Sequence, residues 1–129
     1  MTSQRSSSII ALSVLVFLVA GCGSGSDFPV GSYEMEHNGT QWLMQFNDDG
    51  TWVGIYDGQV DAPEAAGTYT TDDDELTFET DDGCRAETGK ATYTWIAEGD
   101  DLTFVVVGSD LCGGRLSLLD NVTYSVVNE

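Results

Sequence analysis

Basic side chains are almost absent from this chain. Its 129 residues include 4 lysines and arginines against 22 aspartates and glutamates, which gives a formal net charge of -18. Proteins bind nucleic acids mainly by neutralising phosphates with basic groups, and polybasic segments attract proteins to anionic lipid. The composition therefore argues against both kinds of electrostatic partner. Apolar residues, at 41%, are nevertheless abundant enough to build a folded core.

Histidine is equally scarce, because His37 is the single one in the sequence and stands beside Asn38 and Gly39 in an expected turn. Triads of the Ser-His-Asp or Cys-His kind need a base with a pKa near neutrality. A glycosidase-type pair of carboxylates stays open as an alternative. Nearly all the acids, however, fall in expected turns or on polar strand faces. We predict no catalytic residues and no enzyme activity.

A long hydrophobic run is also missing. The apolar stretch at residues 9–20 is interrupted by Ser13 and falls short of the roughly 18 residues that a membrane-spanning helix needs. A short polar segment with Arg5 precedes the stretch and small residues follow it, which is typical of a signal peptide. A permanent membrane helix is the alternative.

The end of this segment, Val19-Ala20-Gly21-Cys22, resembles the lipobox of bacterial lipoproteins. The resemblance implies removal of a signal peptide at residues 1–21 and acylation of Cys22 by palmitate-like chains. Two or more such chains anchor a protein stably. Residues 22–27 would then be the acylated cysteine and a flexible Gly/Ser tether, and the domain would lie outside the cytoplasm on the cell membrane or envelope. An ordinary cleavage that leaves Cys22 as a thiol is the alternative.

With Cys22 acylated, the cysteines that remain are Cys84 and Cys112. Disulfides persist in exported proteins, and closing this loop would stabilise the fold by roughly 3 to 4 kcal/mol in the chain-entropy model. The sequence has no C-x-x-C motif, and His37 lies far away, so a redox pair, a metal site or free thiols are the less favoured alternatives. We predict a Cys84–Cys112 disulfide, no metal and no cofactor.

From residue 28 onward the apolar residues alternate with polar ones, and no stretch of ten or more residues has helical spacing. The alternating runs are Tyr33 with Met35, Trp42 with Met44 and Phe46, Leu76 with Phe78, Tyr93 with Trp95, Leu102 with Phe104 and Val106, Leu116 with Leu118, and Val122 with Tyr124 and Val126. This pattern predicts an all-β domain over residues 28–129.

The turns and an internal repeat refine the fold. Segments rich in Gly, Asn and Asp separate the runs and favour hairpins. Residues 67–70 followed by residues 75–78 recur as residues 91–94 followed by residues 101–104. Eight or nine strands in successive hairpins predict an antiparallel up-and-down meander closed into a barrel, with a β-sandwich as the alternative.

Several motifs together resemble the lipocalin-like (calycin-type) domains of bacterial lipoproteins. They are Gly31-x-Tyr33, Phe46-x-x-Asp49-Gly50-Thr51-Trp52, the Gly-Thr-Tyr-Thr hairpins and the late Arg115. The resemblance covers nearly all of residues 28–128. It implies a small barrel in which Arg115 packs over an aromatic side chain at the closed end, a structural role.

The acidic turns offer two interpretations. Calcium could bind there, although no EF-hand spacing is present. Alternatively, the acidity and the single lysine, Lys90, resemble the surface of halophilic proteins. The candidate calcium ligands are Asp48, Asp49, Asp72, Asp73, Asp74, Asp81, Asp82, Asp100 and Asp101.

Aromatic side chains are the remaining candidates for a site, because they could line a cup for a small apolar ligand. These are Tyr33, Trp42, Trp52, Tyr69, Tyr93 and Trp95. A barrel filled by its own side chains is the alternative. We therefore predict a monomeric, lipid-anchored, non-catalytic envelope domain that binds a small apolar ligand or an envelope partner. The alternative function is a structural or inhibitory domain that contacts a protein through rim loops around Pro63 and Cys84.

Overall fold

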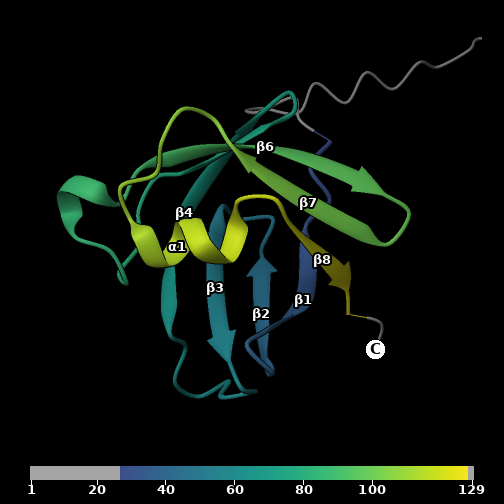
Figure 1. The fold of residues 1–129 in the computed structure, drawn as a ribbon. Coiled ribbons are helices and arrows are strands. Elements are labelled where there is room, and N and C mark those ends of the chain that lie inside the picture. Colours follow the sequence, from purple (N-terminus) through teal and green to yellow (C-terminus); the bar gives the residue numbers. More distant parts are fainter. Residues whose placement is uncertain (1–26, 128–129) are drawn as a thin grey trace, which may run out of the picture.

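The computed structural model describes residues 27–127 as a closed antiparallel barrel (Figure 1). Each strand pairs with the next along the chain, and β8 closes the barrel by pairing with β1. The predicted all-β, up-and-down barrel is therefore confirmed, and the sandwich is not formed. The strands are β1 Gly31–His37, β2 Thr40–Phe46, β3 Thr51–Tyr56, β4 Ala65–Asp72, β5 Glu75–Phe78, β6 Ala91–Glu98, β7 Asp101–Val106 and β8 Val122–Val126.

The hairpin turns follow from residues that tolerate positive φ. Asn38 and Gly39 join β1 to β2 with φ of 52° and 80°, the geometry of a two-residue hairpin turn whose twist matches the strands. Asp73 between β4 and β5 and Gly99 between β6 and β7 also have positive φ, 55° and 59°. These short turns fix the register, and the register decides which face of each strand is buried.

The repeated segments form equivalent hairpins with different registers. Tyr69 on β4 lies opposite Phe78 on β5, whereas the matching Tyr93 on β6 lies opposite Val106 on β7. Phe104, the counterpart of Phe78, lies opposite Trp95 instead. The register differs by an even number of residues, so both tyrosines still face the barrel interior.

One predicted strand is wrong. The segment containing Leu116 and Leu118 is a helix, α1 (Gly113–Leu119), on the connection from β7 to β8. Its buried residues are Arg115 and Leu119, which are four positions apart and therefore share one helix face. Two apolar residues two positions apart are too few to distinguish a strand from a short helix, which explains the error. A 3-10 turn, η1 (Ala86–Thr88), lies on the β5–β6 connection.

One end of the barrel is closed by packed aromatic rings. Phe28 sits there at the start of the described chain, and its ring lies 5.1 Å from Phe46, 5.9 Å from Tyr69 and 5.4 Å from Trp95. Tyr33 donates a hydrogen bond of 2.6 Å to the Pro29 carbonyl, which fixes the same segment. We call this the closed end. Its chain connections, between β2 and β3, β4 and β5, and β6 and β7, are all short.

Candidate ligand cavity at the open end

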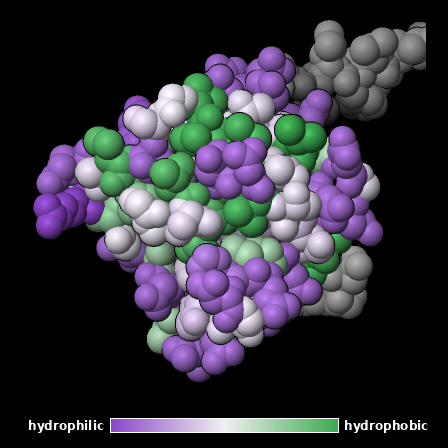
Figure 2. All heavy atoms as spheres, in the orientation of Figure 1, coloured by the Kyte–Doolittle hydropathy of each residue, from purple (hydrophilic) through white to green (hydrophobic). Residues whose placement is uncertain are grey.

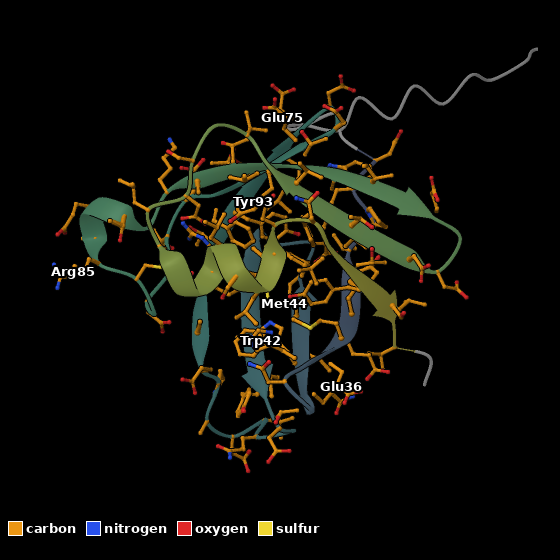
Figure 3. All side chains as sticks on the ribbon, in the orientation of Figure 1. Glu36, Trp42, Met44, Glu75, Arg85 and Tyr93 are labelled. Atoms are coloured by element: carbon orange, nitrogen blue, oxygen red, sulfur yellow. A yellow bond between two sulfur atoms is a disulfide. The ribbon has the colours of Figure 1, made fainter. Side chains whose placement is uncertain are left out.

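The opposite end of the barrel, here called the open end, carries the long connections. Residues 57–64, 79–90 and 107–121 all lie there, because successive strands of an up-and-down barrel alternate in direction. Residues of these connections and of the neighbouring strands line a cavity of about 420 Å³ that is open to solvent. In Figure 1, α1 crosses the front of the barrel, and Figure 3 shows Trp42 and Met44 of β2 below it in the same view. The apolar wall consists of Trp42, Met44, Trp52, Tyr56, Ala65, Leu118 and Leu119.

The position of Trp42 depends on a glycine in the neighbouring strand. A Cβ at Gly54 would lie 2.5 Å from Cζ2 of Trp42, so any other residue there would displace the indole. The Trp42 ring lies 6.3 Å from the ring of Tyr56, which is 42% exposed at the mouth of the cavity. Trp42 itself is only 5% exposed. β2 and β3 thus contribute an aromatic wall that extends from the interior to solvent.

Arg115 is a buried charged group that also lines the cavity. It is 6% exposed, and its guanidinium carbon lies 5.2 Å from the centre of the Phe78 ring. Nε donates 2.7 Å to Asp110 Oδ2 and Nη2 donates 2.9 Å to Asp110 Oδ1, a two-point contact. The remaining donors reach three acceptors: Asp81 Oδ2 at 3.3 Å, the Gly89 carbonyl at 2.7 Å and the Thr88 carbonyl at 3.2 Å. All five N–H groups of the side chain are therefore used inside the protein.

The two carboxyls that face Arg115 have opposite pKa shifts. Burial acts to raise the pKa of Asp110, but hydrogen bonds from Arg115 and Tyr93 outweigh it and hold that pKa below its usual value. Tyr93 donates at 2.5 Å and the backbone N–H of Cys112 at 2.9 Å. For Asp81, burial dominates and raises the pKa, although Gly83 N–H donates to it at 2.8 Å. Burial tends to lower the pKa of Arg115, but Asp110 raises it overall.

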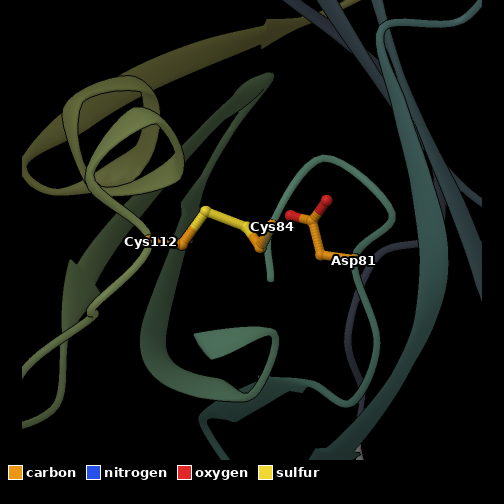
Figure 4. A group of neighbouring side chains, drawn as sticks. All are labelled: Asp81, Cys84 and Cys112. Carbon is orange, nitrogen blue, oxygen red and sulfur yellow. A yellow bond between two sulfur atoms is a disulfide. The ribbon is translucent and has the colours of Figure 1, made fainter. Parts of the chain in front are cut away.

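The predicted disulfide is confirmed. Cys84 and Cys112 are bonded, with their Cα atoms 5.8 Å apart, which is within the usual range for such bridges. Figure 4 shows the bridge between the β5–β6 connection and the residue before α1, with Asp81 beside it. The ligand atoms of Asp81, Cys84 and Cys112 lie within 4.8 Å of one another, a spacing that could suit a metal. With the two sulfurs bonded to each other, neither is available as a thiolate ligand.

The six aromatic candidates divide between the two ends. Trp42 and Trp52 line the cavity, and Trp52 donates 3.2 Å to the Thr80 carbonyl. Tyr33, Tyr69 and Trp95 lie at or near the closed end. Tyr93 is fully buried between Phe78 and Phe104, and its hydroxyl binds Asp110. The structure thus brings two of the six to the cavity.

Several residues of the site were not predicted from the sequence. Met44 shares the face of Trp42 in the alternating run, so its inward orientation was readable although its role was not. Leu118 and Leu119 were not predicted to line the site, because their segment was predicted to be a strand. Nothing in the sequence around Asp110 indicates that its carboxylate is buried at the site. Arg115 packs over the aromatic ring of Phe78 at the open end, whereas the resemblance implied a position at the closed end.

The remaining candidates lie elsewhere. Of the proposed calcium ligands, Asp81 is buried against Arg115. The other eight are exposed, and within residues 27–127 they do not form a three-ligand group with other acids, histidine or cysteine. His37 ends β1 and borders the cavity beside the Asn38-Gly39 turn. Cys22 and the proposed signal peptide lie outside the described residues.

The function of this chain has to be inferred from its structure, because no protein-family model, curated protein or solved structure matches it. Among residues 27–127, no helix combines the length and apolar character needed to cross a membrane. The closed eight-stranded barrel is compatible with the lipocalin-like resemblance.

Proposed function

We propose that this chain is a lipid-anchored, non-catalytic binding domain of the cell envelope that holds a small apolar ligand in the open-end cavity. The observation that carries this proposal is the cavity itself, about 420 Å³ with an aromatic and aliphatic wall. Pockets for small molecules occupy roughly 300 to 1,000 Å³ and are mostly apolar. Eight-stranded barrels of the lipocalin kind have room for one such ligand.

The walls of the cavity are held in place before any ligand arrives. The disulfide joins the β5–β6 connection to the start of α1, and Arg115 binds Thr88 and Gly89 of the same connection. A preformed site loses less conformational entropy when it binds than a site that must be ordered. The saturated hydrogen bonds of Arg115 also support a binding role over a catalytic one, because they leave the guanidinium no free donor for a reacting group.

The proposed anchor and the cavity would be at opposite ends of the domain. The chain enters the barrel at the closed end, where Phe28 packs, and Cys22 precedes this point by six residues. Acyl chains on Cys22 would therefore hold the closed end near the membrane. The open end would face away from the lipid, so the ligand would be taken from the aqueous side.

Tryptophan fluorescence tests the binding site directly, since Trp42 and Trp52 line the cavity. We expect octanol to change the emission in a saturable manner. Leu118→Phe should weaken this response by narrowing the cavity, whereas Leu116→Phe, a matched change on the same helix at a residue that does not line the cavity, should preserve it. Thermal unfolding of both variants checks that each is folded. No saturable response, or equal responses in the two variants, would contradict the proposal.

One observation favours the second candidate, a domain that contacts a protein through its rim. Leu111, next to the disulfide, is 75% exposed, and Val107 on the same connection is 43% exposed. Figure 2 shows hydrophobic residues gathered over the face that carries α1. Failure of every apolar probe to bind in the fluorescence titration would favour this rim function.

A further inference from the structure

The cavity has no free lysine or arginine side chain to offer a ligand. Among the described residues that line it, Arg115 is the single lysine or arginine, and its five N–H groups are already bound to Asp110, Asp81 and two backbone carbonyls. A carboxylate or phosphate on a ligand would have to displace one of these buried acceptors. Two carboxyls surround one guanidinium, so the network as a whole does not attract anions.

The mouth of the cavity combines aromatic rings with a carboxylate. The rings of Trp42 and Tyr56 pack against each other, with their centres 6.3 Å apart and their planes inclined at 54°. The N–H of Glu64 donates 2.9 Å to the carbonyl of Gly54, the glycine against which Trp42 packs. Glu64 also lines the cavity, and it is exposed to solvent.

We propose that the ligand is an apolar ammonium compound, with its hydrocarbon part among Met44, Trp52 and Leu118 and its ammonium group against Trp42, Tyr56 and Glu64. This inference rests on the proposed function, because it assumes that the cavity is a ligand site. Aromatic faces attract ammonium groups, tryptophan most strongly, and a nearby carboxylate adds to the attraction. The formal charge of -18 also repels anionic ligands from the protein as a whole.

Three compounds with the same chain test the charge preference: octyltrimethylammonium, octanol and octanoate. Residues 27–127 contain the whole closed barrel and its disulfide, so this segment can be titrated without the proposed lipid. We expect octyltrimethylammonium to bind about fivefold more tightly than octanol, and octanoate to bind about tenfold more weakly than octyltrimethylammonium or less. Added salt should reduce the first ratio by screening the exposed Glu64.

Two matched variants distinguish the effect of the charge at the mouth of the cavity from the effect of the protein's overall charge. Glu64→Gln should lower the affinity for octyltrimethylammonium about threefold and leave the affinity for octanol unchanged. Glu98→Gln removes the same charge from an exposed position at the β6–β7 turn of the closed end and should change neither affinity. Tyr56→Leu, at a partly exposed ring, should also lower the affinity for the cation selectively.

The outcomes distinguish this inference from the function on which it rests. If none of the three octyl compounds binds, the proposed ligand site fails. If octanol and octanoate bind as tightly as octyltrimethylammonium, the site stands and the charge preference is overturned. If Glu64→Gln and Glu98→Gln weaken the cation equally, the preference arises from net charge, and the placement of the ammonium group at the mouth is overturned.

Discussion

The two ends of the barrel are built from similar residues but in different ways. At the closed end, short turns bring Phe28 against Phe46, Tyr69 and Trp95, and the rings fill the interior. At the open end, Trp42 and Trp52 stand under long connections that are held by a disulfide and a buried charge network, and a cavity remains. Binding residues are commonly carried by loops on a rigid scaffold. The comparison therefore assigns stability to one end and recognition to the other.

The largest expected effect comes from removing the cation at the open end. Arg115→Met would leave Asp110 and Asp81 buried without a counter-charge, which should cost about 3 to 5 kcal/mol in unfolding free energy. Urea unfolding measures it. Arg85→Met is the control, because Arg85 is exposed and extends away from the barrel in Figure 3. A stable Arg115→Met variant would show that the network does not support the open end.

Loss of the disulfide should come next and should act locally. Cys84 and Cys112 are 28 residues apart, and removing the bridge with serine at both positions should cost about 3 to 4 kcal/mol by the chain-entropy model. Amide hydrogen exchange should accelerate in residues 79–90 and 107–121 and stay slow in the strands around Phe46 and Tyr69. Octanol binding should weaken while the barrel persists. Uniform acceleration over the whole barrel would contradict a division between the two ends.

Truncating one side chain at each end of the barrel compares the packing of the two ends directly. Phe28→Ala removes a ring from a packed cluster and should cost about 3 kcal/mol, with octanol binding retained. Leu118→Ala enlarges a space that already exists beside a half-buried residue, so it should cost about 1 kcal/mol. The second variant should also bind a bulkier alcohol than the parent does. Equal losses of stability would mean that both ends are packed alike.

The difference between the ends also explains what the sequence could predict. Alternation in Trp42, Met44 and Phe46 indicates which face of β2 is buried, and Asn38-Gly39 indicates where it turns. Neither indicates which end of the barrel a residue occupies, so Tyr33 and Trp42 looked equivalent as ligand candidates. The end depends on register and on the barrel's closure by β1 and β8, which are long-range properties.

The charge network was beyond sequence reasoning for the same reason. Asp81 and Arg115 are 34 residues apart and meet because the disulfide and the barrel bring two connections together. The cysteine count predicted the bridge, since acylation of Cys22 leaves one pair. The carboxylates resembled the exposed acids of the turns. Their burial follows from the tertiary fold and has no local pattern.

The smallest expected effect is a pH dependence that separates the two carboxyls of the open end. The pKa of Asp110 is lowered in the fold, so its carboxylate stabilises the protein above the unfolded pKa of about 4, and this contribution is lost as the pH falls through the lower folded pKa. The pKa of Asp81 is raised by burial, so its contribution has the opposite sign: it is present below about pH 4 and is lost as the pH rises through the raised folded pKa.

Unfolding free energies of the parent, Asp110→Asn and Asp81→Asn, measured between about pH 2 and pH 7, test this contrast. The difference between the parent and Asp110→Asn should shrink as the medium is acidified, because protonation removes what the substitution removes. The stability of the parent relative to Asp81→Asn should instead increase on acidification. Parallel curves for the two variants would show that Arg115 holds both carboxyls equally.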